Sequence, residues 1–125
     1  MATTREKGRL AERLAEAWLA GRGYVVLDRN HATRGGEVDL VCREGGVLCF
    51  VEVRSRADVH HGAPEETVDR RKALRVVAAA TDWARRNGAL EDDIRFDVLA
   101  VTGEGETPEF ELFQGAFDAA GGAVG

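Results

Sequence analysis

The fold is decided by residues 36–56, which read GEVDLVCREGGVLCFVEVRSR. Two runs rich in Val, Leu, Cys and Phe flank Gly45 and Gly46. A Gly-Gly pair between two such runs is typical of a two-residue turn that joins antiparallel strands. The stretch therefore predicts a β-hairpin with its turn at these two glycines.

This turn fixes which residues face each other across the hairpin. Asp39 is expected opposite Glu52, and Glu37 opposite Arg54. Because side chains alternate along a strand, these four share one face. The opposite face then carries the apolar side chains Val38, Leu40, Val51 and Val53. The pattern predicts one apolar face that enters a core and one face with three carboxylates and a guanidinium.

The opposed carboxylates of Asp39 and Glu52 are the unusual feature. Side chains directly opposite each other have Cβ atoms about 5 Å apart, and like charges at that distance are destabilising. Two facing carboxylates suit Mg²⁺, which proteins typically hold through one or two carboxylates plus water and substrate phosphate. The alternative is a solvated face on which the acidic pair is incidental and Glu37 pairs with Arg54. The pattern alone leaves both interpretations open.

Length and composition indicate one domain with an ordinary core, because the chain has 125 residues of which 44% are hydrophobic and 31% charged. The net charge is −5, but residues 1–88 carry 16 Lys and Arg against 13 Asp and Glu, whereas residues 89–125 carry one against nine. The acidity thus lies in the C-terminal part, and the overall charge does not exclude a nucleic-acid partner. With no long apolar run or signal-like segment, we expect no membrane association and a cytoplasmic location.

The remaining chain alternates between periodic segments and turns. The expected elements are a helix over 5–21, strands over 24–28, 94–101 and 109–113, and a long helix over 65–87. Residues 29–36 are expected to form a polar loop, and residues 119–125 a frayed tail after a domain spanning 1–118. With the hairpin, the order is αβββαββ, which predicts a single α/β domain with a mixed central sheet flanked by helices.

Three further features bear on a site. The two cysteines, Cys42 and Cys49, should face each other on the hairpin, and in a cytosolic chain they are expected to be reduced. Glu12 lies at the edge of the apolar arc of the first helix, where it is either a surface residue or one that looks toward the sheet. Basic side chains gather in the loop and at the start of the second long helix, where they either contact phosphates or keep the surface solvated: Arg34, Arg56, Arg70, Arg71 and Lys72.

Several short motifs together resemble the YraN family of small bacterial proteins. They are Gly8-x-x-x-Glu12, Gly36-Glu37-x-Asp39, Phe50-x-Glu52-x-Arg54-x-Arg56, Gly62-Ala-Pro64, Lys72, Arg95-Phe96-Asp97 and Ala116-Phe117. The resemblance covers nearly the whole chain. That family is similar to the PD-(D/E)XK, restriction-endonuclease-like nucleases and, among them, to Holliday-junction resolvases. It implies a restriction-endonuclease-like fold, a DNA partner and, by analogy with the resolvases, a homodimer.

The resemblance also implies roles for individual residues. Asp39 and Glu52 match the two acidic positions of the nuclease motif, and Glu12 the helix carboxylate that completes a Mg²⁺ or Mn²⁺ site. Arg54 takes the position that is lysine in most relatives, and Glu37 would be an accessory residue. The implied chemistry is metal-dependent hydrolysis of DNA phosphodiesters, in which arginine acts only as a fixed cation because it stays protonated.

The departure at Arg54 leaves a second hypothesis. The chain would then be a non-catalytic nucleic-acid-binding module that keeps the nuclease fold. Salt-dependent binding without metal-dependent turnover is typical of such a module.

Overall fold

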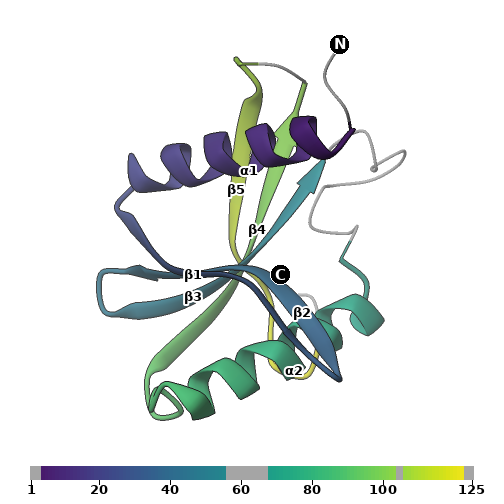
Figure 1. Cartoon of the computed structure of the whole chain (residues 1–125). Coiled ribbons are helices and arrows are strands. Elements are labelled where there is room, and N and C mark those ends of the chain that lie inside the picture. The colour runs from purple at the N-terminus through teal and green to yellow at the C-terminus, as the bar shows by residue number, and fades with distance from the viewer. Residues whose placement is uncertain (1–3, 56–67, 104–105, 123–125) are drawn as a thin grey trace.

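The computed structural model describes residues 4–55, 68–103 and 106–122, and shows a sheet with one helix on each face (Figure 1). The elements in chain order are α1 (Thr4–Ala20), β1 (Tyr24–Thr33), β2 (Gly36–Glu44), β3 (Val47–Ser55), α2 (Arg70–Arg86), β4 (Asp93–Thr102) and β5 (Glu109–Phe117). The predicted αβββαββ order and the α/β class are confirmed.

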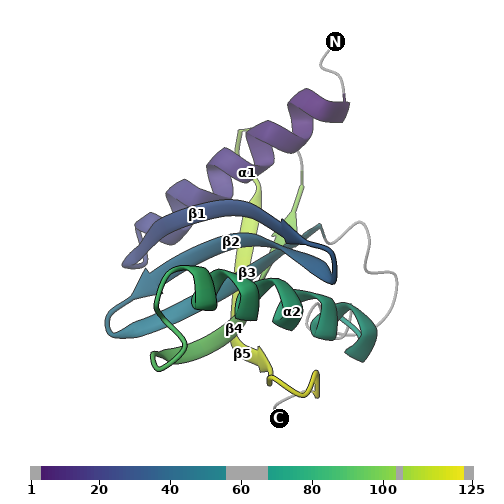
Figure 2. The ribbon, with the colours of Figure 1, turned by 60° about the horizontal axis from the view of Figure 1, so that its bottom comes forward.

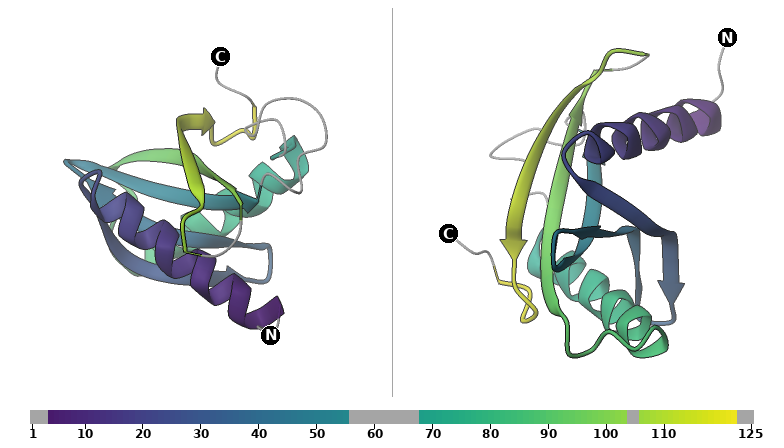
Figure 3. Two further views of the ribbon diagram at one scale, coloured as in Figure 1. Left: turned by 90° about the horizontal axis from the view of Figure 1, so that it is seen from above. Right: turned by 90° about the vertical axis from the view of Figure 1, so that its left-hand side faces the viewer.

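The sheet has the strand order β1-β2-β3-β4-β5 and is mixed. β3 and β4 run parallel, and the other neighbours are antiparallel. A parallel pair needs a long crossover connection, and α2 lies within that crossover. Figure 2 shows α2 lying across one face of the sheet, and both views of Figure 3 place α1 on the opposite face. Residues far apart in the sequence are thereby brought to the β2–β3 hairpin from both sides.

The hairpin is buried on both faces, which corrects the expectation of one apolar and one polar face. The α2 side holds Val38, Val41, Leu48 and Phe50 together with the buried residues of α2. The α1 side holds Leu40, Cys42, Cys49 and Val51, with Ala15 and Leu19 of the helix. A helix on each face requires apolar side chains on each face. Val38 lies on the opposite side of the sheet from Leu40, not beside it as predicted, so the regular alternation of β2 is interrupted between these residues, next to the last regular pair, Leu40 opposite Val51.

The predicted register of the hairpin is confirmed over five residue pairs, from Glu44 opposite Val47 to Leu40 opposite Val51. Gly45 has φ +59°, in the left-handed region that favours glycine. Cys42 lies opposite Cys49, and both are buried free thiols. Burial raises the pKa of each thiol to about 12, so both stay protonated and act as small apolar side chains.

Two strands extend beyond their predicted ends. β1 includes Arg29–Thr33, predicted as a loop, because these residues pair with β2 as far as Thr33 opposite Gly36. Their polar side chains suit an edge strand, which is why they resemble a loop in the sequence. β5 continues to Phe117, past the predicted end at Phe113, with an irregularity opposite the stretch from Phe96 to Val98.

The second helix begins at Arg70, later than the predicted Glu65. Asp69 caps it, since its side chain accepts a hydrogen bond from the backbone N–H of Lys72 at 2.8 Å. Residues 65–67 lie outside the described part of the chain. The helix packs closely on β2 at Gly36, where an added Cβ would lie 2.0 Å from the carbonyl oxygen of Arg75. Glycine at position 36 therefore sets how closely α2 approaches the hairpin.

Part of the predicted frayed tail is ordered. The backbone N–H groups of Ala120 and Gly122 donate to Asp118 Oδ1, and Gly121 lies against Arg70 and Leu74 of α2. Residues 123–125 lie outside the described residues. Among the described helices, none combines the length and apolar character needed to cross a membrane.

Candidate metal and phosphodiester site

Asp39 and Glu52 meet at the point where the regular pairing of β2 and β3 ends. The backbone N–H of Asp39 donates to Glu52 Oε1 at 3.2 Å, and the N–H of Val53 donates to Asp39 Oδ2 at 2.8 Å. Each carboxylate thus takes the place of a backbone carbonyl on the facing strand. These two bonds fix the carboxylates beside each other and leave one oxygen of each for a cation.

Burial makes the pair costly to ionise. Glu52 has a side chain only 4% exposed. Burial first, and then the charge of Asp39, raises its pKa to about 7. Burial likewise raises the pKa of Asp39, opposed by the hydrogen bond from Val53 and the charge of Lys72. Two carboxylates that resist ionisation together are an arrangement that a bound cation would relieve.

The cation nearest to the pair comes from α2. Lys72 Nζ lies 3.5 Å from Glu52 Oε2, and its side chain is 35% exposed. The Asp69 cap places Lys72 in the first turn of α2, directed at the hairpin. Lys72 was predicted as a phosphate contact on the helix surface, so its place at the carboxylates is a finding of the structure. The helix and strand segments are too far apart in the sequence for their spacing to predict this contact.

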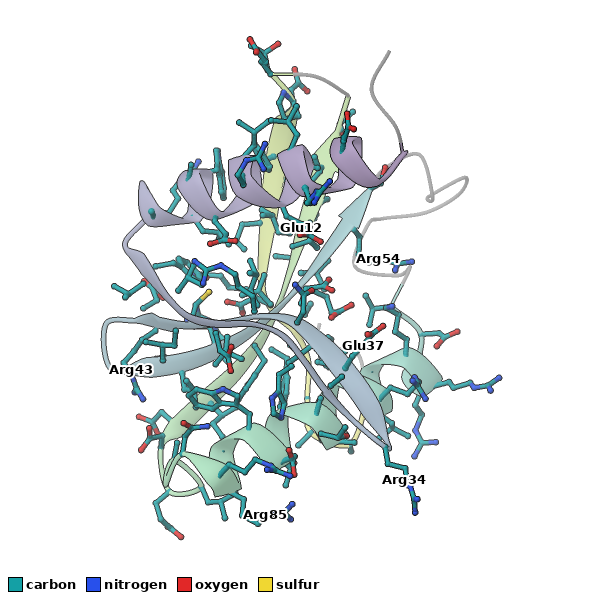
Figure 4. All side chains as sticks on the ribbon, viewed as in Figure 1. Glu12, Arg34, Glu37, Arg43, Arg54 and Arg85 are labelled. Atoms are coloured by element: carbon teal, nitrogen blue, oxygen red, sulfur yellow. The ribbon has the colours of Figure 1, made fainter. Side chains whose placement is uncertain are left out.

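Arg54, the residue at the motif's lysine position, projects from β3 near the same end of the sheet (Figure 4). Its Nε atom is buried, and no described residue accepts a hydrogen bond from it. The expected pairing with Glu37 is not observed, since no ion pair or hydrogen bond joins these two residues. Glu37 is exposed, and its charge contributes to the raised pKa of Asp39. The orphaned guanidinium nitrogen indicates that an oxygen-bearing group belongs beside it.

Glu12 lies on the side of α1 that faces the sheet (Figure 4). Its side chain is exposed, and its charge is among the smaller causes of the raised pKa of Asp39. Within residues 4–55, 68–103 and 106–122, no three His, Cys, Asp or Glu side chains are close enough to hold one metal ion together. The third carboxylate is thus near the pair but is not gathered into a three-ligand set.

The donor atoms nevertheless fit a hard divalent cation. Mg²⁺ is commonly bound by one or two carboxylates, with water and substrate phosphate filling its remaining positions. Asp39 and Glu52 supply two such carboxylates, the first half-buried and the second buried, and each is oriented by a backbone N–H group. Of the three residues predicted as metal ligands, the structure brings Asp39 and Glu52 together, with Glu12 close enough for its charge to act on Asp39.

The predicted nucleic-acid contacts separate into three groups. Arg70 and Arg71 are exposed on the first turn of α2, next to Lys72. Arg34 is exposed in the β1–β2 turn. Arg56 lies outside the described residues. The basic side chains that can be placed therefore follow α2 and the edge of the sheet nearest to it.

A second polar cluster, which the sequence analysis does not predict, lies inside the α1 side. Asp97 is fully buried and accepts hydrogen bonds from the hydroxyl of Tyr24, the guanidinium of Arg95 and the backbone N–H of Gly115. Arg95 also bonds Glu44 Oε1 at 2.9 Å. Because both oxygens of Asp97 accept hydrogen bonds and the cluster joins β1, β2, β4 and β5, it holds these strands together.

The fold and site define a class of protein: an α/β domain with a mixed sheet, a half-buried and a buried carboxylate paired in a β-hairpin, and a helix lysine beside them. The chain belongs to the uncharacterised protein family UPF0102, whose family model matches residues 11–101. This is the YraN family, so the resemblance drawn from the motifs is confirmed.

The curated relatives include family members from several bacteria. A UPF0102 protein of Anaeromyxobacter sp. (strain Fw109-5) is 66% identical over 117 residues, covering 94% of this chain and 88% of the relative. One from Anaeromyxobacter dehalogenans is 64% identical, covering 91% and 85%. One from Chromohalobacter salexigens is 45% identical, covering 93% and 94%. The similarity thus extends over most of both chains in each case.

Proposed function

We propose that the chain is a metal-dependent nuclease that hydrolyses phosphodiester bonds in DNA at Asp39, Glu52 and Lys72. The observation that carries the proposal is the pair of carboxylates, Glu52 buried and Asp39 half-buried, each fixed by a backbone N–H and each with a raised pKa. Lys72 is a single positive charge beside two carboxylates that repel each other, and a divalent cation would offset the remaining repulsion.

Each residue has a separate role in this proposal. Asp39 and Glu52 would hold Mg²⁺, and the bound ion would supply a nucleophilic water and neutralise negative charge on the phosphate. Arg54, two residues after Glu52 on β3, has a buried Nε without a hydrogen-bond acceptor, and it would donate that hydrogen to a phosphate oxygen. Glu37 and Glu12 add negative charge around the pair and favour cation entry.

Lys72 would supply the ammonium group that is missing from β3, where Arg54 occupies the lysine position of the nuclease motif. Its ammonium group forms an ion pair with Glu52. A compact ammonium on a flexible stem can move to an incoming phosphate, whereas the guanidinium of Arg54 is a fixed planar cation. The helix lysine and the strand arginine together would provide two positive charges at the scissile phosphate, where negative charge develops.

Cleavage assays on a panel of DNA structures, with Mg²⁺ or Mn²⁺, test the proposal. Asp39→Asn and Glu52→Gln are each expected to reduce cleavage more than about 100-fold, because even partners of metal ligands typically contribute 10–100-fold to affinity or activity. Lys72→Met is expected to lose cleavage while still binding metal. The control is Glu106→Gln, an exposed carboxylate before β5. Undiminished cleavage by either carboxylate variant would refute the proposal.

A non-catalytic nucleic-acid-binding module is the second candidate function. It is favoured by the arginine at position 54 and by the ion pair in which Lys72 already neutralises Glu52. The Arg54→Lys variant separates the two functions. Cleavage gained only in that variant would indicate a nuclease fold that binds without cutting, whereas cleavage by the wild type supports the enzyme.

A further inference from the structure

A second basic feature lies away from the carboxylates, between α2 and the β1–β2 turn. It is a groove of about 730 Å³, which we call the Arg34 groove. Its lining is His31, Ala32, Thr33, Arg34 and Gly35 from the strand and turn, and Ala78, Thr81, Asp82, Arg85 and Arg86 from α2. Figure 4 shows Arg34 and Arg85 projecting on the same lower side of the molecule. The groove thus brings together arginines from two distant parts of the sequence.

The charge of the groove favours an anion. Its lining holds three arginines and one carboxylate, a net charge of +2 with His31 neutral. The carboxylate, Asp82, is only 12% exposed, whereas the side chains of Arg85 and Arg86 are 65% and 69% exposed. The positive charge is therefore presented to solvent and the negative charge lies beneath it.

Asp82 also orients the arginines. Arg85 Nη2 lies 2.7 Å from Asp82 Oδ1, and Arg86 Nε lies 2.8 Å from Asp82 Oδ2. His31 Nε2 holds the same carboxylate at 2.9 Å. Because each guanidinium uses one N–H group on Asp82, the others remain for an incoming ligand. Two anchored guanidiniums beside a third on a tight turn form a surface suited to phosphate oxygens.

The position of the groove relative to the carboxylates fits a continuous backbone. Lys72 contacts Glu52 at the start of α2, and Asp82 lies ten positions later on the same helix. At about 1.5 Å per residue the two points are about 15 Å apart along the helix. DNA advances about 3.4 Å per nucleotide, so this distance spans about four nucleotides.

We propose that the Arg34 groove binds the sugar-phosphate backbone of the DNA about four nucleotides from the bond that is cut. This rests on the proposed function, since it assigns the groove to the same substrate. The groove contributes affinity for the DNA and orients its backbone, whereas hydrolysis takes place at the carboxylates. Contacts of this type go to phosphate and carry no base sequence information.

The test measures binding of a fluorescently labelled 30-base-pair DNA duplex by anisotropy at several salt concentrations. The variant is Arg34→Gln/Arg85→Gln. The matched control is Arg22→Gln/Arg43→Gln, which removes the same charge elsewhere: Arg22 stacks on Trp18, and Arg43 pairs with Asp92. Loss of two phosphate contacts is expected to weaken binding at least tenfold and to make the slope of log K against log salt shallower by about 2.

The outcomes separate this inference from the proposed nuclease. Weaker binding and a shallower slope in the groove variant alone support the groove, even if the wild type does not cut DNA. Equal losses in the control variant, an unchanged slope, or no binding of the duplex by the wild type would each overturn it. Calorimetry is expected to show that the Arg34→Gln/Arg85→Gln variant binds Mn²⁺ as tightly as the wild type does.

Discussion

Replacing Glu52 with glutamine is expected to stabilise the metal-free protein at pH 8. Burial and the charge of Asp39 raise the pKa of Glu52 from 4.5 to about 7 in the folded state. The folded state therefore binds more protons than the unfolded state between these values, and the free energy of unfolding falls as the pH rises through 7. This pKa shift corresponds to a loss of about 3 kcal/mol of stability when Glu52 ionises in the folded protein. A glutamine at this position is always neutral, so the variant does not suffer that loss.

The check is urea unfolding of both proteins at pH 5 and pH 8. At pH 8 the free energy of unfolding of the variant is expected to exceed that of the wild type by about 2 kcal/mol, because the lost attraction to Lys72 offsets part of the gain. The difference is expected to shrink toward pH 5. Glu37→Gln, at an exposed carboxylate of the neighbouring strand β2, is the control and should change stability by less than about 0.5 kcal/mol. A Glu52→Gln protein less stable than the wild type at both pH values would show that the pair is structural.

Replacing Asp97 with alanine is expected to cost about 3–5 kcal/mol, because it leaves buried donors without an acceptor. The hydroxyl of Tyr24, the guanidinium of Arg95 and the N–H of Gly115 all donate to this one carboxylate. Burial raises the pKa of Tyr24, so its hydroxyl keeps its proton and continues to need a partner. Thermal and urea unfolding measure the loss.

Asp93→Ala provides the control for that experiment. Asp93 lies on the same strand, β4, but is exposed, so its loss is expected to change stability by less than about 0.5 kcal/mol. Similar costs at both positions would mean that the Asp97 cluster contributes no more than a surface carboxylate. The cluster would then not be what joins the strands.

The hairpin and its carboxylates could be predicted from sequence because the information is local. Gly45-Gly46 fixes the turn, and the turn fixes the register as far as Leu40 opposite Val51, which leaves Asp39 and Glu52 as the next residues on the two strands. The burial of both hairpin faces could not be predicted in the same way. It depends on α1 and α2 packing on opposite sides of the sheet, and no pattern within 36–56 contains that arrangement.

The contacts of Lys72 and of the Arg34 groove depend on tertiary structure. Lys72 reaches Glu52 only because Asp69 starts α2 at that point and because the close approach at Gly36 holds the helix against β2. The strand residues Arg29–Thr33 were missed because an edge strand with polar side chains has the composition of a loop. Their pairing with β2 is what sets Arg34 at a tight turn beside α2.

Metal binding by Asp39 and Glu52 can be measured by calorimetric titration of Mn²⁺ at pH 8 into the wild type and the Asp39→Asn/Glu52→Gln variant. This pH is above the pKa of Glu52, which is about 7, so Glu52 is ionised and the metal ion does not compete with a proton for it. We expect the wild type to bind Mn²⁺ saturably and the variant not to bind it. Equal binding by both proteins, or no binding by the wild type, would contradict a metal site at Asp39 and Glu52.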